Sequence, residues 1–213
     1  GTIRPGSMKL EDLNGDGKIN ENDKTIIGNA NPKHTGGFSI NTRYKNFDLT
    51  ALFNWSFGND IYNANKIEYT QTSKYHSRNM ISIMEEGQRW TNLLPDGTIS
   101  NDPAQLAAMN ANTTLWSPLT KQFIFSDWAV EDGSFLRLGT LTLGYTFSNE
   151  LLQKVKVKNL RIYGTGYNLF RITNYSGFDP EVSTRRQSAL TPGVDYSAYP
   201  KSRLYVVGIN LSF

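Results

Sequence analysis

Apolar and polar residues alternate with a period of two in two runs of the N-terminal half, and this pattern predicts two β-strands. From residue 38 to residue 44, Phe, Ile, Thr and Tyr share one side of an extended chain; from 47 to 57, every second residue is Phe, Leu, Ala, Phe, Trp and Phe. A two-residue turn at Lys45-Asn46 places Tyr44 opposite Phe47, with both apolar rows on one face. The sequence therefore predicts a hairpin of strands at about 36–45 and 47–58.

The same alternation returns in the C-terminal half and predicts three further strands, at about 135–147, 159–170 and 204–213. The apolar face of the middle strand is ambiguous, because Gly164 and Gly166 leave one side nearly bare. Polar segments at 1–35, 58–134 and 171–203 complete the chain. The expected fold class is therefore all-β, with five strands joined by long loops.

Two short helices are expected inside the 58–134 loop. Asp102 followed by Pro103 is typical of a helix N-terminus, and Gln105 is expected to bond back to the N-cap, which predicts a helix to about Asn110. Residues 78–86 are a second helical candidate.

Short connections follow Tyr44 and Phe147, whereas long ones follow Phe57 and Phe170. Alternating strands of about 10 residues, with short turns at one end and long loops at the other, are typical of a transmembrane β-barrel wall. A soluble β-sandwich remains the alternative, since its strands also alternate. Because about eight strands are needed to close a barrel, most of the wall is expected upstream of Gly1 or in other chains.

Composition excludes several classes of protein. The chain has no Cys, which excludes disulfide scaffolds, Cys-ligated zinc and thiol catalysis. It contains 22 Lys and Arg against 19 Asp and Glu, and a net charge of +3 is too small to indicate nucleic-acid binding. The mean hydropathy of −0.47 is low, and no apolar run reaches the roughly 18 residues of a membrane-spanning helix.

A twelve-residue segment matches a calcium-binding loop. Gly17 stands where the loop must turn sharply, and Ile19 is the expected apolar anchor. Asp23 occupies the last ligand position, where sensor proteins carry Glu, so bidentate closure is in doubt. The alternative is a solvated loop of Asx turns. The expected Ca²⁺ ligands are Asp12, Asn14, Asp16, the backbone carbonyl of Lys18, and Asp23.

Other polar groups do not form a catalytic constellation. His34 and His76 lie in polar segments without a partner at ligand spacing, and Glu85-Glu86 diverge on a helix. For Trp90 and Trp116, loop packing is favoured over stacking on a sugar. The acidic cluster of Asp127, Glu131 and Asp132 is expected to cap a loop. Three alternate lysines, Lys154, Lys156 and Lys158, are expected to lie on a solvated turn. No enzyme is therefore expected.

Several sequence blocks resemble the C-terminal region of SusC/RagA-type TonB-dependent outer-membrane transporters of Bacteroidetes. They span nearly the whole chain in the family's order. They are the calcium segment with Ile26-Ile27-Gly28-Asn-Ala-Asn-Pro32, the block from Glu131 to Phe147, Tyr167-Asn168-Leu169-Phe170, Tyr175-Ser-Gly-Phe178-Asp179-Pro180-Glu181, Tyr199-Pro200-Lys-Ser-Arg203, and Gly208-Ile-Asn-Leu-Ser-Phe213.

The resemblance implies a 22-stranded antiparallel transmembrane β-barrel in the outer membrane, to which this chain contributes the last five strands. It also implies import of glycans or peptides with energy from TonB, which acts through an N-terminal region missing here. A SusD-like surface lipoprotein is the implied partner, outer-membrane lipid surrounds the wall, and the long loops, including the calcium segment, are extracellular. The alternative function is a soluble secreted calcium-dependent β-sandwich carbohydrate-binding module.

Overall fold

The computed structural model describes residues 4–72, 77–120, 124–153, 156–182 and 191–213, and the chain forms two compact units. One unit contains Gly1–Ile27 and Asn63–Ala129. The other contains Gly28–Tyr62 and Val130–Phe213. Within the described residues, none of the helices has the length and apolar character needed to cross a membrane.

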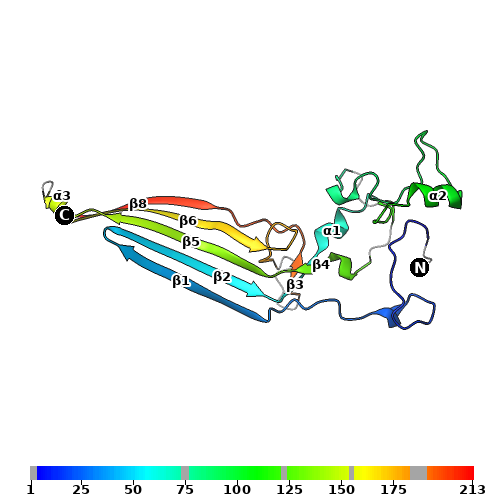
Figure 1. Ribbon diagram of the computed structural model, residues 1–213, viewed down its shortest axis with the longest axis horizontal. Helices are drawn as coiled ribbons and strands as arrows, with labels where there is room; N and C mark the ends of the chain where they lie inside the picture. Colours follow the sequence, from blue (N-terminus) through cyan, green and yellow to red (C-terminus); the bar gives the residue numbers. More distant parts are fainter. Residues whose placement is uncertain (1–3, 73–76, 121–123, 154–155, 183–190) are drawn as a thin grey trace. The chain divides into compact units, whose positions relative to one another are not determined.

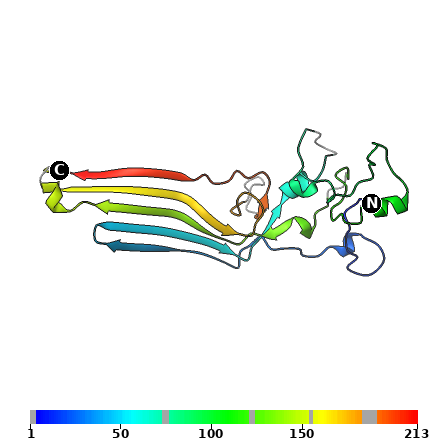
Figure 2. The same ribbon diagram turned by 45° about the horizontal axis from the view of Figure 1, so that its top comes forward.

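The second unit is built on one antiparallel sheet whose five strands run side by side in the order β1-β2-β5-β6-β8 (Figures 1 and 2). The alternating pattern located all of them, although β6 extends three residues past the predicted end and β1 begins two residues early. The strands are β1 (His34–Tyr44), β2 (Phe47–Phe57), β5 (Phe135–Thr146), β6 (Asn159–Thr173) and β8 (Leu204–Ser212).

The predicted hairpin has the predicted register. Tyr44 lies opposite Phe47, and Lys45 takes the left-handed backbone conformation, with φ of 52°, that the tight turn requires. At the far end of the hairpin, His34 pairs with Phe57. The Nδ1 atom of His34 accepts a hydrogen bond of 3.2 Å from Nε1 of Trp55. The prediction that His34 lies in the polar segment before the first strand is therefore wrong. These two contacts make His34 the first residue of β1.

A β-bulge at Gly139 changes which residues of β5 share a face. Leu52 of β2 lies opposite Thr140, whereas the next residue, Phe53, lies opposite Leu138, so Gly139 is the extra residue. The bulge moves Leu138 onto the apolar face and turns Arg137 to the polar face, opposite Asn54. The bulge therefore determines on which face of the sheet Arg137 lies.

Short elements follow the strands. Helix α3 (Asn149–Gln153) lies in the turn between β5 and β6. A small sheet in the order β4-β3-β7 lies within the predicted loops and was not expected, because its strands are too short to show alternation. Ile61, Tyr175 and Val182 form a buried cluster beside it. The strands are β3 (Asp60–Asn63), β4 (Val130–Asp132) and β7 (Val194–Asp195).

The first unit contains short helices joined by loops: η1 (Glu21–Asp23), α1 (Ala64–Glu68), η2 (Ser82–Met84), α2 (Pro103–Met109) and η3 (Asp127–Ala129). The predicted α2 is present, and the Asp102 side chain accepts from the Ala104 N–H. The predicted role of Gln105 is wrong: its Oε1 accepts from the Ser100 hydroxyl, which in turn accepts from the Asp102 N–H.

The predicted helix at 78–86 is also wrong. Its helical part is a single 3₁₀ turn, in which the Met84 N–H donates to the Ile81 carbonyl and the Glu85 N–H donates to the Ser82 carbonyl. Glu85 and Glu86 therefore do not lie on a regular helix.

Candidate functional site

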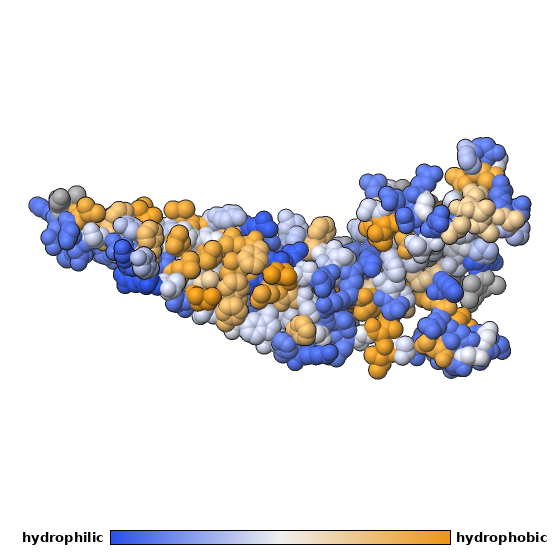
Figure 3. Space-filling view, viewed as in Figure 1, coloured by the Kyte–Doolittle hydropathy of each residue, from blue (hydrophilic) through white to orange (hydrophobic). Residues whose placement is uncertain are grey.

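The five-stranded sheet presents one continuous apolar face. Register places apolar residues of all five strands on the same side, and the glycines of β6, Gly164 and Gly166, lie on this side opposite Val207 and Tyr205. This settles the ambiguous face of β6. The side chains are well exposed, for example Ile209 at 64% and Val207 at 80%. Figure 3 shows hydrophobic residues gathered over the sheet. Other members are Phe38, Ile40, Phe47, Leu143, Ile162, Phe170 and Leu211.

The opposite face carries polar residues that bond across strands. Arg161 of β6 reaches past β5 to Asp48 of β2, donating from Nε at 2.9 Å and from a terminal nitrogen at 2.5 Å. This fork needs Gly144 between the two side chains, because a Cβ there would collide with both. The hydroxyls of Thr142 and Thr165 lie 2.9 Å apart on the same face.

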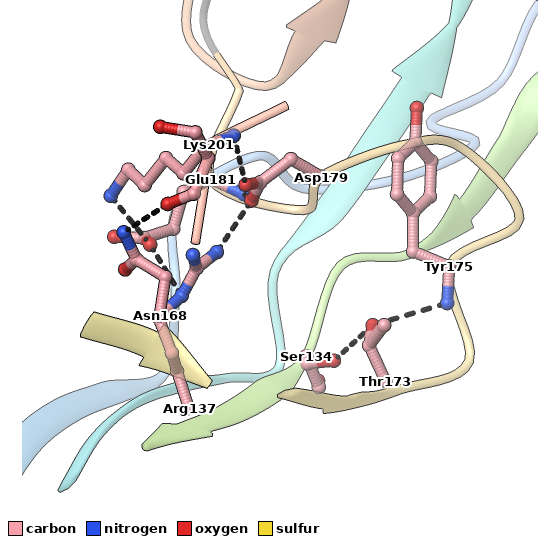
Figure 4. A network of polar contacts seen from close by, with 9 residues as sticks. Ser134, Arg137, Asn168, Thr173, Tyr175, Asp179, Glu181 and Lys201 are labelled. Carbon is pink, nitrogen blue, oxygen red and sulfur yellow. Dashed lines mark hydrogen bonds and ion pairs between the residues drawn. The ribbon is translucent and has the colours of Figure 1, made fainter. Parts of the chain in front are cut away.

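Arg137 joins the polar face to the segment after β6 (Figure 4). A terminal nitrogen donates to Asp179 Oδ1 at 2.6 Å, and both side chains are nearly fully buried. Nε of Arg137 lies 2.9 Å from Glu181 Oε2, an ion pair without hydrogen-bond geometry. Lys201 Nζ donates to the same Glu181 oxygen at 2.8 Å.

Further hydrogen bonds connect the end of β6 to the start of β5 and to β7. Thr173 donates to the Ser134 carbonyl at 2.8 Å and accepts from the Tyr175 N–H (Figure 4). The Tyr175 hydroxyl donates to Asp195 Oδ2 at 2.6 Å. Burial and the adjacent Asp195 carboxylate raise the pKa of Tyr175, so this phenol stays protonated and continues to donate.

The charge state of Asp179 depends on opposing effects. Burial disfavours the carboxylate, but the Glu181 N–H and Arg137 stabilise it and hold the pKa of Asp179 below its ordinary value. The side chain is therefore ionised, and the pair with Arg137 is a buried salt bridge.

In the sequence, Arg137 lies in the block from Glu131 to Phe147, whereas Asp179 and Glu181 lie in the block that begins at Tyr175. Their pairing was not predicted. The sequence did predict that Glu131 and Asp132 cap a loop, and they do: Glu131 accepts from both the N–H and the hydroxyl of Ser176, and Asp132 accepts from the Ser134 N–H. No periodicity could reveal the Arg137 contacts, because both partners, Asp179 and Glu181, lie in the loop after β6, more than 40 residues further along the chain.

The predicted calcium segment folds as a closed loop in the first unit. Asp12 accepts from the N–H groups of Gly15, Asp16 and Gly17, with the shortest distances 2.7 Å. Asp23 accepts from the N–H groups of Leu13 and Asn20 and belongs to the capping box of η1.

The remaining polar contacts of this loop are local. The Asn20 N–H is the largest of the contacts that lower the pKa of Asp23, and the Asp12 side chain also contributes. Asn14 and Asp16 bond to each other rather than to a distant group. Across the described part of the chain, however, His, Asp and Glu side chains are not grouped by threes in a geometry that could hold a metal.

The other candidates serve structure. Trp116 is buried and packs edge-on against Trp128, with ring centroids 4.6 Å apart. Trp128 in turn lies under Lys66 Nζ, 4.3 Å from the ring centroid. Lys156 and Lys158 are exposed at a turn. His76 and Lys154 lie outside the described residues.

No family model matches the chain. Among curated proteins, it is 33% identical over its whole length to the TonB-dependent receptor P3 of Formosa agariphila, and 29% identical over 99% of its length to the TonB-dependent receptor SusC of Bacteroides thetaiotaomicron. It covers 20% and 18% of these relatives, respectively. The chain thus spans about a fifth of the length of the curated relatives it matches.

Solved structures of RagAB have the same fold. A structure of the RagAB peptide transporter matches with a TM-score of 0.69 and 26% identity, over 92% of this chain and 19% of that chain. A structure of the RagAB peptide importer in the open-open state matches with a TM-score of 0.62 and 28% identity, over the same shares. The resemblance found in the sequence is therefore confirmed, and the chain belongs to the SusC/RagA-type TonB-dependent receptors.

Proposed function

We propose that the chain forms part of the membrane wall and external loops of an outer-membrane importer. SusC/RagA-type TonB-dependent receptors are outer-membrane proteins. The observation that carries the proposal is the exposed apolar face that continues across all five strands. A wall strand presents such a face to lipid and its polar face to the barrel interior.

The alternative, a soluble β-sandwich, is less consistent with this face. A sandwich buries the apolar face of one sheet under a second sheet of similar extent. Among the described residues, the second sheet has strands of only four, three and two residues, and the apolar face of the large sheet remains exposed. A patch of this size needs lipid or another chain to cover it.

In this proposal the five strands belong to a 22-stranded barrel, and the segments 1–35, 58–134 and 171–203 lie on the extracellular side. TonB supplies the energy through an N-terminal region that this chain does not contain, and a SusD-like lipoprotein captures the cargo, a glycan or a peptide. The family relationship supports these assignments, and the relative RagAB is a peptide transporter. No chemical step is assigned to the chain.

Two neighbouring residues of β1 give the test. Ile40 points to the apolar face and Ser39 to the polar face. Lysine on the lipid side near the bilayer midplane costs about 2–4 kcal/mol, whereas lysine on the interior side is tolerated. In the full receptor, Ile40→Lys should lower the heat-modifiable, membrane-inserted fraction several-fold, and Ser39→Lys should leave it nearly unchanged.

Equal losses for both variants would show that the apolar face does not contact lipid. Release of the receptor from membranes by alkaline carbonate would favour the soluble alternative instead, because integral barrels remain in the membrane pellet.

We also propose that the loop from Asp12 to Asp23 binds a structural calcium ion. The supporting observation is that backbone N–H groups orient the Asp12 carboxyl group, and that the Leu13 N–H, directly after Asp12, holds the Asp23 carboxyl group at the start of the loop. Oxygen ligands of this kind suit Ca²⁺, and extracellular sites with dissociation constants of about 10⁻⁴–10⁻³ M can remain filled. The ligands would be Asp12, Asn14, Asp16, the Lys18 carbonyl and Asp23.

Calorimetric titration with CaCl₂ tests this second proposal. The receptor should bind one additional Ca²⁺ compared with Asp16→Ala, and calcium should raise its melting temperature. Asp96→Ala is the matched control, since Asp96 closes a similar turn with Thr98 in the same unit. Indistinguishable titrations for the receptor and Asp16→Ala would leave the loop as a solvated turn.

A further inference from the structure

A basic pocket lies where β5 begins and β6 ends. Its volume is about 430 Å³, and the residues that line it include Arg137, Arg171, Lys201 and Arg203 together with Asn168 and Phe170. Figure 4 shows Arg137, Asn168 and Lys201 converging at this place. Arg171 is the direct cross-strand partner of Arg137, so both belong to the polar face of the sheet.

The cations of this pocket are only partly neutralised. Asp179 and Glu181 compensate Arg137 and Lys201. Arg171 and Arg203 are exposed, and no ion pair is formed by either one with the residues that the structure describes. Two carboxylates against four cations leave a local excess of two positive charges.

Arg171 lies directly opposite Arg137, whose charge is already balanced by Asp179. The uncompensated charges of the pocket are therefore those of Arg171 and Arg203. An anion placed between these two guanidinium groups would balance them. The pocket is therefore suited to bind a negatively charged group from outside the chain.

We propose that this pocket binds an acidic sugar unit of the imported substrate, which deepens and rests on the proposed importer function. Guanidinium groups bind carboxylate and sulfate oxygens in pairs, with a geometry that lysine does not offer. The Asn168 amide donates from Nδ2 to the Ser202 carbonyl at 3.0 Å, which leaves its Oδ1 to accept from a sugar hydroxyl. Both sugar carboxylates and sugar sulfates have the required chemistry.

An acidic peptide is the competing ligand, and the lining favours it less. Peptides are usually held by backbone pairing at a strand edge or by apolar pockets for side chains. Apart from Phe170, whose side chain belongs to the opposite face of the sheet, the lining residues are charged or polar, so they do not form an apolar pocket for a peptide side chain.

Equilibrium binding to the detergent-solubilised full receptor tests the proposal. The probes are trigalacturonate for carboxylates, N-acetylglucosamine 6-sulfate for sulfates, maltotriose as the neutral sugar and triaspartate as the acidic peptide. The double variant Arg171→Gln/Arg203→Gln should weaken binding of an acidic sugar at least tenfold. The control Lys156→Gln/Lys158→Gln removes the same charge from an exposed turn and should change binding less than twofold.

Higher affinity for trigalacturonate or for the sulfated sugar identifies the preferred group, and either result supports the proposal. Three outcomes overturn it: neither acidic sugar binds, the Arg171→Gln/Arg203→Gln variant binds as well as the receptor, or triaspartate binds as tightly as the acidic sugars. Because binding is measured in detergent, its loss is separable from failed membrane insertion, which would contradict the importer function instead.

Discussion

Arg137 is the residue that fastens the long segment after β6 to the sheet. Its bond to Asp179 is buried, so replacement by Gln would leave an unpaired carboxylate in the interior. Breaking a buried ion pair from one side costs about 3–5 kcal/mol. We therefore expect Arg137→Gln to speed proteolytic cleavage between residues 174 and 182 by at least tenfold, as measured by mass spectrometry of a digestion time course.

Arg161→Gln is the matched control for this prediction, because it removes an arginine whose partner, Asp48, is also a carboxylate but is less buried. Exposed ion pairs contribute about 0–1 kcal/mol, and this half-buried pair should stay well below the cost at Arg137. If both variants are cleaved at the same rate, Arg137 does not fasten the segment.

The Arg137–Asp179 pair also shows what the sequence could not predict at the scale of residues. The two residues are separated by most of β5, a turn, all of β6 and part of a loop, and neither alternation nor spacing relates them. The calcium segment is different, because the groups that accept its hydrogen bonds lie within ten residues of the donors. Local chemistry of this kind can be deduced from sequence, whereas long-range pairing depends on the fold.

At the scale of elements, long strands could be predicted and short ones could not. β1 and β2 carry enough alternating residues to reveal their apolar side, whereas β7 has only two residues. The bulge at Gly139 did leave a signal, because Leu136 and Leu138 are out of phase with Leu141. That change of phase indicates an extra residue, and Gly139 lies at the point where it occurs.

The β1–β2 turn allows a prediction at the same scale. Lys45 is held at φ of 52°, a conformation that costs a side chain about 1–2 kcal/mol and costs glycine little. Lys45→Gly should therefore stabilise the hairpin by up to about 1 kcal/mol, after the entropy of the unfolded glycine is included. Lys45→Val should destabilise it by about 1–2 kcal/mol.

Urea unfolding of the refolded receptor, followed by tryptophan fluorescence, measures both changes. Lys158→Gly is the control, because Lys158 is exposed and has no positive φ. Equal effects of glycine at both positions would mean that the turn conformation of Lys45 carries no strain.

At the scale of the whole molecule, the chain leaves and re-enters the second unit at neighbouring positions. Tyr62, near the end of β3, lies directly opposite Val130 at the start of β4. The residues between them, Asn63–Ala129, belong to the other compact unit. A short connection can therefore join β3 to β4 without moving either strand, because antiparallel neighbours need only a two-residue turn.

We expect a receptor in which Asn-Gly replaces residues 63–129 to assemble in the outer membrane at a level within about twofold of the intact receptor. Replacing residues 174–203 by a Gly-Ser linker of the same length should abolish most assembly, because that segment supplies Asp179, Glu181 and Asp195 to buried contacts of the second unit. Quantitative immunoblots of outer-membrane fractions, with and without heating, measure both. Loss of assembly in the first variant would mean that the β-sheet unit depends on the other unit for its folding, and normal assembly in the second would mean that the buried Arg137 network is dispensable.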